Sequence, residues 1–333
     1  MATVQRLKTR AGFPVGRSLT VLHVSRATYF RWAQAGGKGP RPAAVVPKAH
    51  WITPAERAAI IAYARAHPEL GYTRLTYQLA DAGIAAVSPS SVYSILTEAG
   101  LLGRWQPVHA AHRTGFVQPT RPHEQWHTDI AYLNILGTQY FLLGVLDGYS
   151  RAILHAEIRR PMTTTDVEII LERALATLPA DTPRPRLITD NGSQYVSAQF
   201  TQYLRTTGLS HSRTRVGHPQ SNGKYERWNK TAKDECIRRM ALGGRDDPDA
   251  LAEAQQVFSG YVTHYNTVRP HSALHYLTPA DYLRGSAHVE AKLTARASAY
   301  REAAATRRQY WSSYRTTASA TPLMRTSESL ISA

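Results

Sequence analysis

The middle of the chain limits the possible folds more than any other part. Three stretches of strand length, rich in apolar, β-branched and aromatic side chains, lie at residues 128–135, 139–146 and 152–158. A helical stretch, a short apolar strand and a second helical stretch follow at residues 163–178, 186–189 and 198–206. Strands and helices in this order predict an α/β domain with a mixed sheet. We expect Thr164 or Thr165 to cap the first of these helices.

A helical region precedes this domain. Thr53 stands before a helical pattern at residues 53–66, with Pro54 at the first helical position and Glu56 at the third. A Thr at the N-cap and a Glu at N3 satisfy two unpaired backbone donors reciprocally, which is the capping box. The sequence therefore predicts a helix that begins at Pro54.

Two further helical patterns lie at residues 71–82 and 90–99, with Gly83 in the turn between them and Gly100 at the end. Short helices joined in this way match a helix-turn-helix, whose second helix enters the major groove of DNA with its N-terminal residues. The candidates for DNA contact are then Ser90, Ser91 and Tyr93.

A smaller unit of the same kind spans residues 19–33, where Ser25 would cap the second helix. Arg26 would follow that cap and face a phosphate or a base. For both units the alternative is an ordinary helical bundle without DNA contact.

Basic residues gather at the two ends of the chain. The sequence has 40 Lys and Arg against 24 Asp and Glu, a formal net charge of +16. Residues 1–115 hold 14 basic and 4 acidic side chains and residues 286–333 hold 7 and 3, whereas residues 116–285 hold 19 and 17. Such an excess favours a polyanionic partner, either nucleic acid or an acidic membrane surface.

The composition excludes a membrane-spanning protein, a disulfide framework and a cysteine-based zinc module. No stretch approaches the roughly 18 consecutive apolar residues of a membrane span, so we expect a soluble, cytoplasmic protein without a membrane partner. The single cysteine, Cys236, excludes a disulfide framework and a cysteine-based zinc module, because both need several thiols.

Three carboxylates occupy informative positions. Asp129 lies within the first expected strand, where a carboxylate is unfavourable unless something uses it. Asp190 directly follows the strand at residues 186–189, and sites in open α/β sheets lie at the carboxyl ends of strands. Glu226 lies in a helical stretch over residues 222–240, and 35 residues separate it from Asp190. Each acid also has an ordinary structural role, so this spacing alone is weak support.

Five motifs give these carboxylates a context. They are Trp126-x-x-Asp129-Ile130, residues 147–151 (DGYSR), residues 189–195 (TDNGSQY), residues 218–226 (HPQSNGKYE) and Tyr265-Asn266-x-x-Arg269-Pro270-His271. In this order they resemble the integrase-like DDE transposases of bacterial insertion sequences. The resemblance covers about residues 55–285.

The resemblance implies a ribonuclease H-like catalytic core, with a mixed five-stranded sheet, flanking helices and Asp129, Asp190 and Glu226 as a metal-binding catalytic triad. The implied cofactors are two Mg²⁺ or Mn²⁺ ions per active site. Hard cations prefer oxygen ligands, and two ions about 3.5–4 Å apart can activate the nucleophile and stabilise the leaving oxygen in phosphodiester chemistry. The family usually has Thr where this chain has Ala131, which removes a hydrogen bond beside the triad but leaves the triad itself.

The implied reaction is cleavage at the ends of the element followed by strand transfer, without a covalent protein intermediate. The expected partners are transposon-end double-stranded DNA and target DNA, bound by a homodimer or a higher oligomer, because two ends must be joined. Asn222, Lys230 and Lys233 fall four before, four after and seven after Glu226, on one helix face. A solvated Glu–Lys pair is one interpretation. Contact with DNA phosphates is favoured, because the family has a basic residue at the Lys233 position.

A second motif suggests a competing interpretation. Residues 123–127 match H-E-x-x-H, which binds zinc in metalloproteases when both His lie on one helix face. Pro122 before the motif and a strand after it leave no room for a helix, so we interpret the match as accidental. A catalytically inactive DNA-binding relative and a ribonuclease acting on RNA–DNA hybrids are the remaining alternatives. We expect Tyr265, Asn266 and Arg269 to pack and cap the last helix of the core.

These observations predict five segments. They are a small helix-turn-helix-like unit at residues 1–36, a helix-turn-helix domain at 50–104, a linker at 105–121, the ribonuclease H-like core at 122–285 and a basic helical tail at 286–333. A second linker, rich in Gly and Pro, is expected at residues 36–42. The tail shows an amphipathic pattern that suits either DNA or another subunit.

Overall fold

The computed structural model describes residues 2–34, 47–102, 118–135, 138–214, 222–240 and 250–320. The chain divides into two compact units, one made of residues 1–51 and 306–333 and the other of residues 52–305. The expected linker at residues 36–42 and most of the one at 105–121 lie outside the described residues, as do the first four residues of the 218–226 motif.

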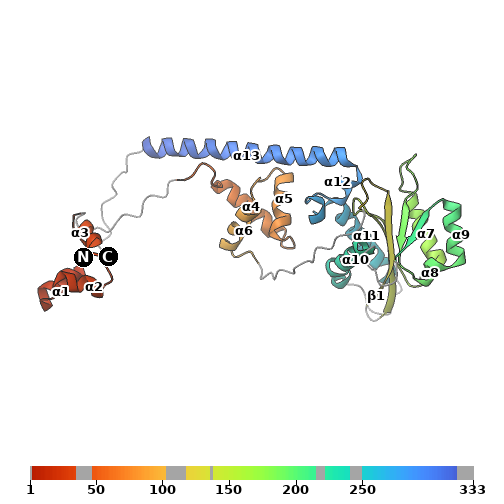
Figure 1. Ribbon diagram of the computed structural model, residues 1–333, viewed down its shortest axis with the longest axis horizontal. Coiled ribbons are helices and arrows are strands. Elements are labelled where there is room, and N and C mark those ends of the chain that lie inside the picture. Colours follow the sequence, from red (N-terminus) through yellow and green to blue (C-terminus); the bar gives the residue numbers. More distant parts are fainter. Residues whose placement is uncertain are drawn as a thin grey trace. The chain divides into compact units, whose positions relative to one another are not determined.

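A five-stranded mixed sheet forms the centre of the larger unit (Figure 1). Its strands are β1 (Gln125–Ile135), β2 (Thr138–Asp147), β3 (Ile153–Arg159), β4 (Arg186–Thr189) and β5 (Ser210–Arg213), in the order β3-β2-β1-β4-β5. The first three strands are antiparallel neighbours, whereas β4 and β5 add in parallel beside β1. The predicted fold class, a mixed five-stranded sheet with flanking helices, is confirmed.

Helices cover both faces of this sheet, as Figure 1 shows. One layer contains α7 (Thr164–Leu175), α8 (Ser193–Val196) and α9 (Ala198–Thr207); the other contains α10 (Gly223–Glu235), the short 3₁₀ helix η2 (Ile237–Arg239) and α11 (Ala250–Thr267). Successive side chains of a strand point to opposite faces of the sheet. Leu142 packs in the same core cluster as Trp228 of α10, and Leu143 packs in the same cluster as Ile170 of α7. Each face therefore has its own apolar core.

A three-helix region precedes the sheet in the larger unit. It consists of α4 (Pro54–Ala66), α5 (Tyr72–Asp81) and α6 (Pro89–Glu98). The predicted capping box is present, because Thr53 Oγ1 accepts from the Glu56 N–H and the Glu56 carboxylate accepts from the Thr53 N–H. Helix α5 ends in a Schellman motif in which the Ile84 N–H donates to the Leu79 carbonyl across Gly83, whose φ is +67°.

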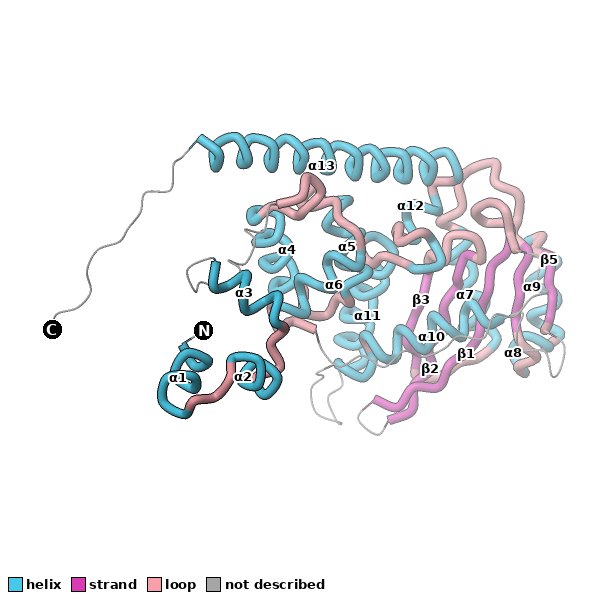
Figure 2. The backbone as a smooth tube through the Cα atoms, turned by 60° about the vertical axis from the view of Figure 1, so that its left-hand side comes forward, coloured by secondary structure: helices cyan, strands magenta, loops and turns pink. Residues whose placement is uncertain are grey.

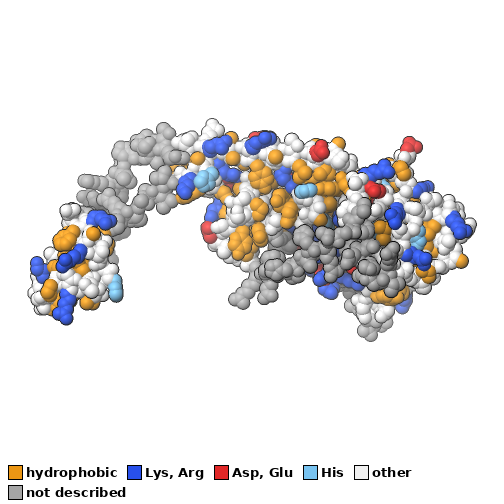
Figure 3. Space-filling model, viewed as in Figure 1, with side chains coloured by type: hydrophobic (Ala, Val, Ile, Leu, Met, Phe, Trp, Pro, Cys, Tyr) orange, Lys and Arg blue, Asp and Glu red, His pale blue; other side chains and the backbone are white. Residues whose placement is uncertain are grey.

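The smaller unit contains α1 (Ala2–Ala11), α2 (Val15–Val21) and α3 (Arg26–Gln34), traced in Figure 2. Ser25 Oγ accepts from the Thr28 N–H, so Ser25 caps α3 as expected. Val4, Leu19 and Tyr29 form a small buried cluster. Lys and Arg side chains lie on the surface of these helices (Figure 3).

After α11 the chain forms η3 (Ser272–Leu274), α12 (Pro279–Leu283) and the long helix α13 (Ser286–Ala320). The helical C-terminal tail that the sequence predicts is thus present. Among the described residues no helix combines the length and apolarity needed to cross a membrane.

Three local features differ from the sequence predictions. Thr163, not Thr164 or Thr165, caps α7, because Asp166 lies at the position that completes its capping box. Strand β5 was not located from the sequence, because its residues are polar and lack the apolar pattern of a strand. The helix expected over residues 222–240 ends at Glu235, and Asn222 is its N-cap.

Candidate active site

The three candidate carboxylates come from β1, from the end of β4 and from α10. Asp129 lies opposite Gly144 in the β1–β2 ladder. The parallel register pairs His127 of β1 with Ile188 of β4, and Asp190 follows Thr189, the last residue of β4. Asp190 Oδ1 accepts from the Gly192 N–H at 2.9 Å, which fixes the turn after β4. Glu226 lies in the first turn of α10, on the exposed side of the helix.

Negative charge is concentrated around Asp129. Burial raises the pKa of its carboxyl, and the charges of Asp190 and Glu226 raise it further, to about 6. The Ile130 N–H, which donates to Asp129 Oδ1 at 2.9 Å, and the Lys233 ammonium act in the opposite direction. Asp190, Glu226 and Lys233 therefore all lie within electrostatic reach of Asp129.

This donor set has the chemistry of a site for hard divalent cations. All three groups are carboxylates, and Mg²⁺ and Mn²⁺ prefer oxygen ligands. The mutual repulsion of these acids is what a cation would relieve. Among the described residues, however, no group of three or more His, Cys, Asp and Glu side chains is already gathered around one point.

Helix α10 is held against the sheet by buried aromatic residues. Tyr225 and Trp228 are fully buried in the core beneath α10, and the Gly144 N–H donates to Tyr225 Oη at 2.8 Å. A Cβ on Gly144 would lie 3.0 Å from the Trp228 ring. The absence of a side chain beside Asp129 thus lets the helix that carries Glu226 approach β1 closely.

The lysines on α10 share a groove with Glu226. The groove has a volume of about 350 Å³ and is lined by Glu226, Asn229, Lys230, Lys233 and Arg238. Arg238 is also ion-paired with Asp234 one turn earlier. Sequence reasoning missed Asn229 and Arg238, although the spacing of three between Glu226 and Asn229 places both on one helix face.

Asn222 does not lie in the groove with Lys230 and Lys233, the residues with which it was predicted to contact DNA. Its side chain is 3% exposed, and Nδ2 donates to the Thr128 carbonyl at 3.2 Å. Asn222 therefore attaches the start of α10 to β1 beside Asp129 and does not line the groove.

The turn between β2 and β3, in the DGYSR motif, is a structural element. Asp147 is fully buried and accepts from the His123 N–H, the Ser150 N–H and the Ser150 hydroxyl at 2.6–2.8 Å. Lys224 Nζ donates to the Gly148 carbonyl at 2.8 Å. Burial, and then the Arg151 charge, lower the pKa of Lys224 to about 7. The motif thus ties the start of α10 to the sheet.

The motif that begins at Tyr265 packs the end of α11, as expected. Asn266 donates to the Ile153 carbonyl at 2.8 Å and accepts from the Ile153 N–H at 2.9 Å. Arg269 donates two hydrogen bonds of 2.7 Å to the Glu235 carboxylate and lies over the Tyr265 ring. These contacts join α10, α11 and β3.

The residues that match H-E-x-x-H do not lie on a helix. Residues from Gln125 onward form β1, and His123 has a φ of +60° outside any helix. His127 is fully buried on β1, and Trp126 Nε1 donates to His123 Nδ1. The geometry of a zinc protease is therefore absent, as the sequence predicts.

The candidate DNA-contacting residues of the helical regions lie at helix starts. Ser90 is exposed and Ser91 half-buried, and both hydroxyls lie 2.9 Å from the hydroxyl of the cap residue Ser88. Tyr93 is 50% exposed and packs edge-on against Tyr72. Arg26 is exposed at the start of α3.

Sequence comparisons place this chain in a family. Models of two families, each described as an integrase core domain, match residues 119–219 and 207–279. Transposase InsD for insertion element IS2D of Escherichia coli strain K12 is 31% identical over 231 residues, which cover 65% of this chain and 74% of that protein. The chain belongs to the integrase-core transposases of insertion elements.

Other members of this transposase family align over a smaller part of their length. The transposase for insertion sequence element IS904 of Lactococcus lactis is 32% identical over 166 residues, 49% of this chain and 62% of that protein. The 48.2 kDa protein of element IS2A from E. coli is covered to 53%. The chain thus spans between half and two thirds of the length of these two relatives.

Solved structures show more distant likenesses. The catalytic core domain of HTLV-2 integrase in complex with magnesium is 18% identical, with a TM-score of 0.39, and covers 49% of this chain and 97% of its own. The simian T-cell lymphotropic virus intasome in complex with the PP2A regulatory subunit B56 gamma gives 19% identity and a TM-score of 0.42, covering 68% of this chain and 75% of its own.

Proposed function

We propose that this transposase-family chain binds the ends of an insertion element and catalyses DNA cleavage and strand transfer with Asp129, Asp190 and Glu226. One observation carries the proposal. The charges of Asp190, directly after β4, and of Glu226 on α10 act on Asp129 of β1, and α10 also presents Lys230 and Lys233 in the same groove as Glu226.

The residues of the chain would divide the work in the following way. Lys230 and Lys233 bind DNA phosphates and hold the scissile bond beside the carboxylates, because contacts to phosphates set the register of DNA on a protein. Mg²⁺ or Mn²⁺ ions held by Asp129, Asp190 and Glu226 would supply positive charge to the phosphate under attack. Burial and the neighbouring carboxylates disfavour the negative charge on Asp129, and a bound cation would offset this cost.

Replacement of one carboxylate tests the proposal. The substrate is a duplex that carries the terminal inverted repeats we expect in the DNA flanking the gene. We expect Glu226→Gln to lower Mg²⁺-dependent cleavage and strand transfer by at least about 1,000-fold, or ~4 kcal/mol in barrier height, with binding of the duplex unchanged. Glu290→Gln, at an exposed position on α13, is the matched control and should retain full activity. Full activity in Glu226→Gln would refute the triad.

A second candidate is a DNA-binding relative that does not cut. It is favoured by the absence, among the described residues, of a carboxylate cluster already gathered around one point. The wild-type chain decides between the two, since a protein that binds end duplex but never cleaves it in Mg²⁺ or Mn²⁺ fits only the second candidate.

Helix α6 is the element that we propose to read the element ends. Tyr93 and Ser90 are exposed near its N-terminus, the part of a recognition helix that contacts base edges. We expect the double variant Ser90→Ala/Tyr93→Ala to bind end duplex about 10-fold more weakly, with binding of unrelated duplex little changed. Tyr132→Ala, at an exposed position of β1, is the control. Equal loss on both duplexes would contradict sequence reading by α6.

Joining two ends requires two copies of the end-binding surface. We therefore propose that the chain acts as a dimer or higher oligomer on DNA. Sedimentation of the protein with end duplex should give a species with at least two chains, and a strictly monomeric complex that still joins ends would contradict this.

A further inference from the structure

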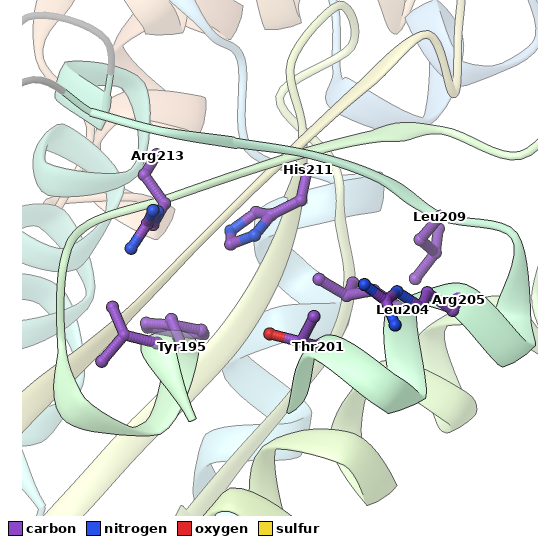
Figure 4. A pocket seen from close by; sticks show the side chains of 8 residues that line it. Tyr195, Thr201, Leu204, Arg205, Leu209, His211 and Arg213 are labelled. Carbon is purple, nitrogen blue, oxygen red and sulfur yellow. The ribbon is translucent and has the colours of Figure 1, made fainter. Parts of the chain in front are cut away.

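A second basic pocket lies on the opposite face of the sheet from the α10 groove. It has a volume of about 310 Å³ and is formed by β5, α8 and α9. Figure 4 shows His211 and Arg213 of β5 and the hydroxyl of Thr201 on α9 facing the same space, with Arg205 at its side. Its remaining lining residues are Tyr195, Val196, Leu204 and Leu209.

The chemistry of this pocket suits an anion. Its lining contains two guanidinium groups, the imidazole of His211 and no carboxylate. Of its two hydroxyls, that of Thr201 donates to the Ser197 carbonyl and that of Tyr195 lies against Thr128. Arginine forks bind phosphate oxygens through paired N–H donors. The apolar side chains of Leu204 and Leu209 form the floor and belong to the core on this face of the sheet. A sugar-phosphate unit therefore matches both parts of the lining.

Two hydrogen-bonded contacts connect the pocket to the candidate carboxylates. Tyr195 Oη lies 3.4 Å from Thr128 Oγ1, next to Asp129 in the chain. His211 Nε2 lies 2.9 Å from Thr189 Oγ1, and Thr189 in turn donates to the carbonyl of Asp190. These contacts join the pocket lining to Thr128 and Thr189, which precede Asp129 and Asp190 in the chain.

Strand transfer needs two DNA molecules at one set of carboxylates. The α10 groove, lined by Lys230 and Lys233, lies on one face of the sheet beside Glu226. We propose that the pocket of Arg205, His211 and Arg213 binds a backbone phosphate of the second duplex, the target. This assignment rests on the proposed function, because only a reaction that joins two duplexes requires two such surfaces.

The test separates strand transfer from cleavage. In the full-length protein we expect Arg205→Ala/Arg213→Ala to lower strand transfer into a target duplex of random sequence by at least about 10-fold. Cleavage of the end duplex should stay within about twofold of wild type. Arg284→Ala/Arg301→Ala, at two exposed arginines away from the site, is the matched control and should leave both steps intact. Unchanged strand transfer in the pocket variant would overturn the inference.

Salt dependence gives a second readout that needs no catalysis. In the Glu226→Gln background, the slope of log affinity for random duplex against log salt should fall by about one for each lost phosphate contact. The conservative variant Arg205→Lys/Arg213→Lys keeps both charges and should restore that slope, which separates charge loss from misfolding. A slope equal to that of the parent protein in the alanine variant would overturn the inference even if no protein cleaved DNA. Competition by millimolar inorganic phosphate without any change of slope would mark a site for free phosphate only, and would overturn it as well.

Discussion

His271 lies among positive charges that come from several elements. Burial, followed by the charges of Arg269, Arg151, Arg74 and Arg227, lowers the pKa of its imidazole to about 4. Its Nδ1 accepts from the Ala273 N–H and caps η3, which also requires the neutral ring. The motif that contains His271 thus stabilises the core only while this residue is uncharged.

This arrangement predicts loss of stability in acid. The pKa of His271 in the folded protein is below the unfolded value of about 6.5. The contribution of this residue to the free energy of unfolding is therefore fully present above pH ~6.5 and is lost as the pH drops toward 4. His271→Asn keeps a hydrogen-bond acceptor but has no group that titrates in this range. Between pH 7 and pH 4.5 its free energy of unfolding, measured in urea, should therefore fall by about 1–3 kcal/mol less than that of wild type. His264→Asn, at an exposed position of α11, should follow wild type. Parallel pH profiles for wild type and His271→Asn would contradict the prediction.

At the scale of elements, the packing of α10 on β2 sets the distance between Glu226 and Asp129. Gly144 lies opposite Asp129, and a Cβ there would lie 3.0 Å from the Trp228 ring and 3.2 Å from the Ala156 Cβ. We expect Gly144→Ala to cost about 1–3 kcal/mol in stability through overpacking. Cleavage of end duplex should fall at least 10-fold at a temperature where the variant is folded, because displaced α10 carries Glu226 with it.

Gly260→Ala provides the control for this substitution. Gly260 lies within α11, and a Cβ there meets nothing within 4 Å. Alanine has a higher helix propensity than glycine, so this variant should be about as stable as wild type or more stable. If Gly144→Ala retained full cleavage activity, the spacing between α10 and β1 would not limit catalysis.

Helix α11 covers an edge of the sheet. Strand β3 is the outermost strand on its side, and its free edge would expose unpaired backbone groups. Asn266 binds both backbone groups of Ile153, and Gln255 Oε1 accepts from the Ile158 N–H at 2.7 Å. These two amide side chains take the place of a further strand.

Removal of the amides should expose this edge. We expect Asn266→Ala to lower the free energy of unfolding by about 1–3 kcal/mol, because it leaves buried backbone groups unpaired. Light scattering should show faster aggregation, since an open strand edge pairs with other chains. Gln139→Ala, at an exposed position of β2, removes an amide without opening an edge and is the control. Unchanged stability and aggregation in Asn266→Ala would contradict this role.

Local signals made some elements predictable and left others hidden. Thr53 with Glu56, and Gly83 and Gly100, fix helix ends through contacts within a few residues, so the sequence revealed them. Strand β5 is polar and short, and only its pairing with β4 defines it. The candidate carboxylates were found from the motifs around them. The burial of Asn222 and the pocket of Arg205 and Arg213 depend on contacts between distant segments, which no local pattern encodes.

For the molecule as a whole, Arg296 joins three parts of the larger unit. Its guanidinium is 6% exposed and donates to both carboxylate oxygens of Asp81 on α5, at 2.8 and 2.6 Å. It also donates to the carbonyls of His275 and Tyr276 and lies over the ring of Tyr77, which stacks on Tyr276. Arg296 therefore connects α13 and the segment before α12 to the helical region that we propose to bind element ends.

A double-mutant cycle on Asp81→Asn and Arg296→Met measures this connection. Loss of either partner leaves a half-buried charge without compensation, so we expect about 2–4 kcal/mol for Arg296→Met and a coupling energy of about 1–3 kcal/mol. The exposed pair Arg57–Glu98, with side chains 43% and 56% exposed, should give a clearly smaller coupling energy in the same urea experiment, because solvent screens exposed charges. Equal coupling in the two cycles would show that Arg296 adds no more than a surface ion pair. A larger coupling for Arg296 and Asp81 would mean that this ion pair stabilises the packing of α13 on the helical region that we propose to bind element ends.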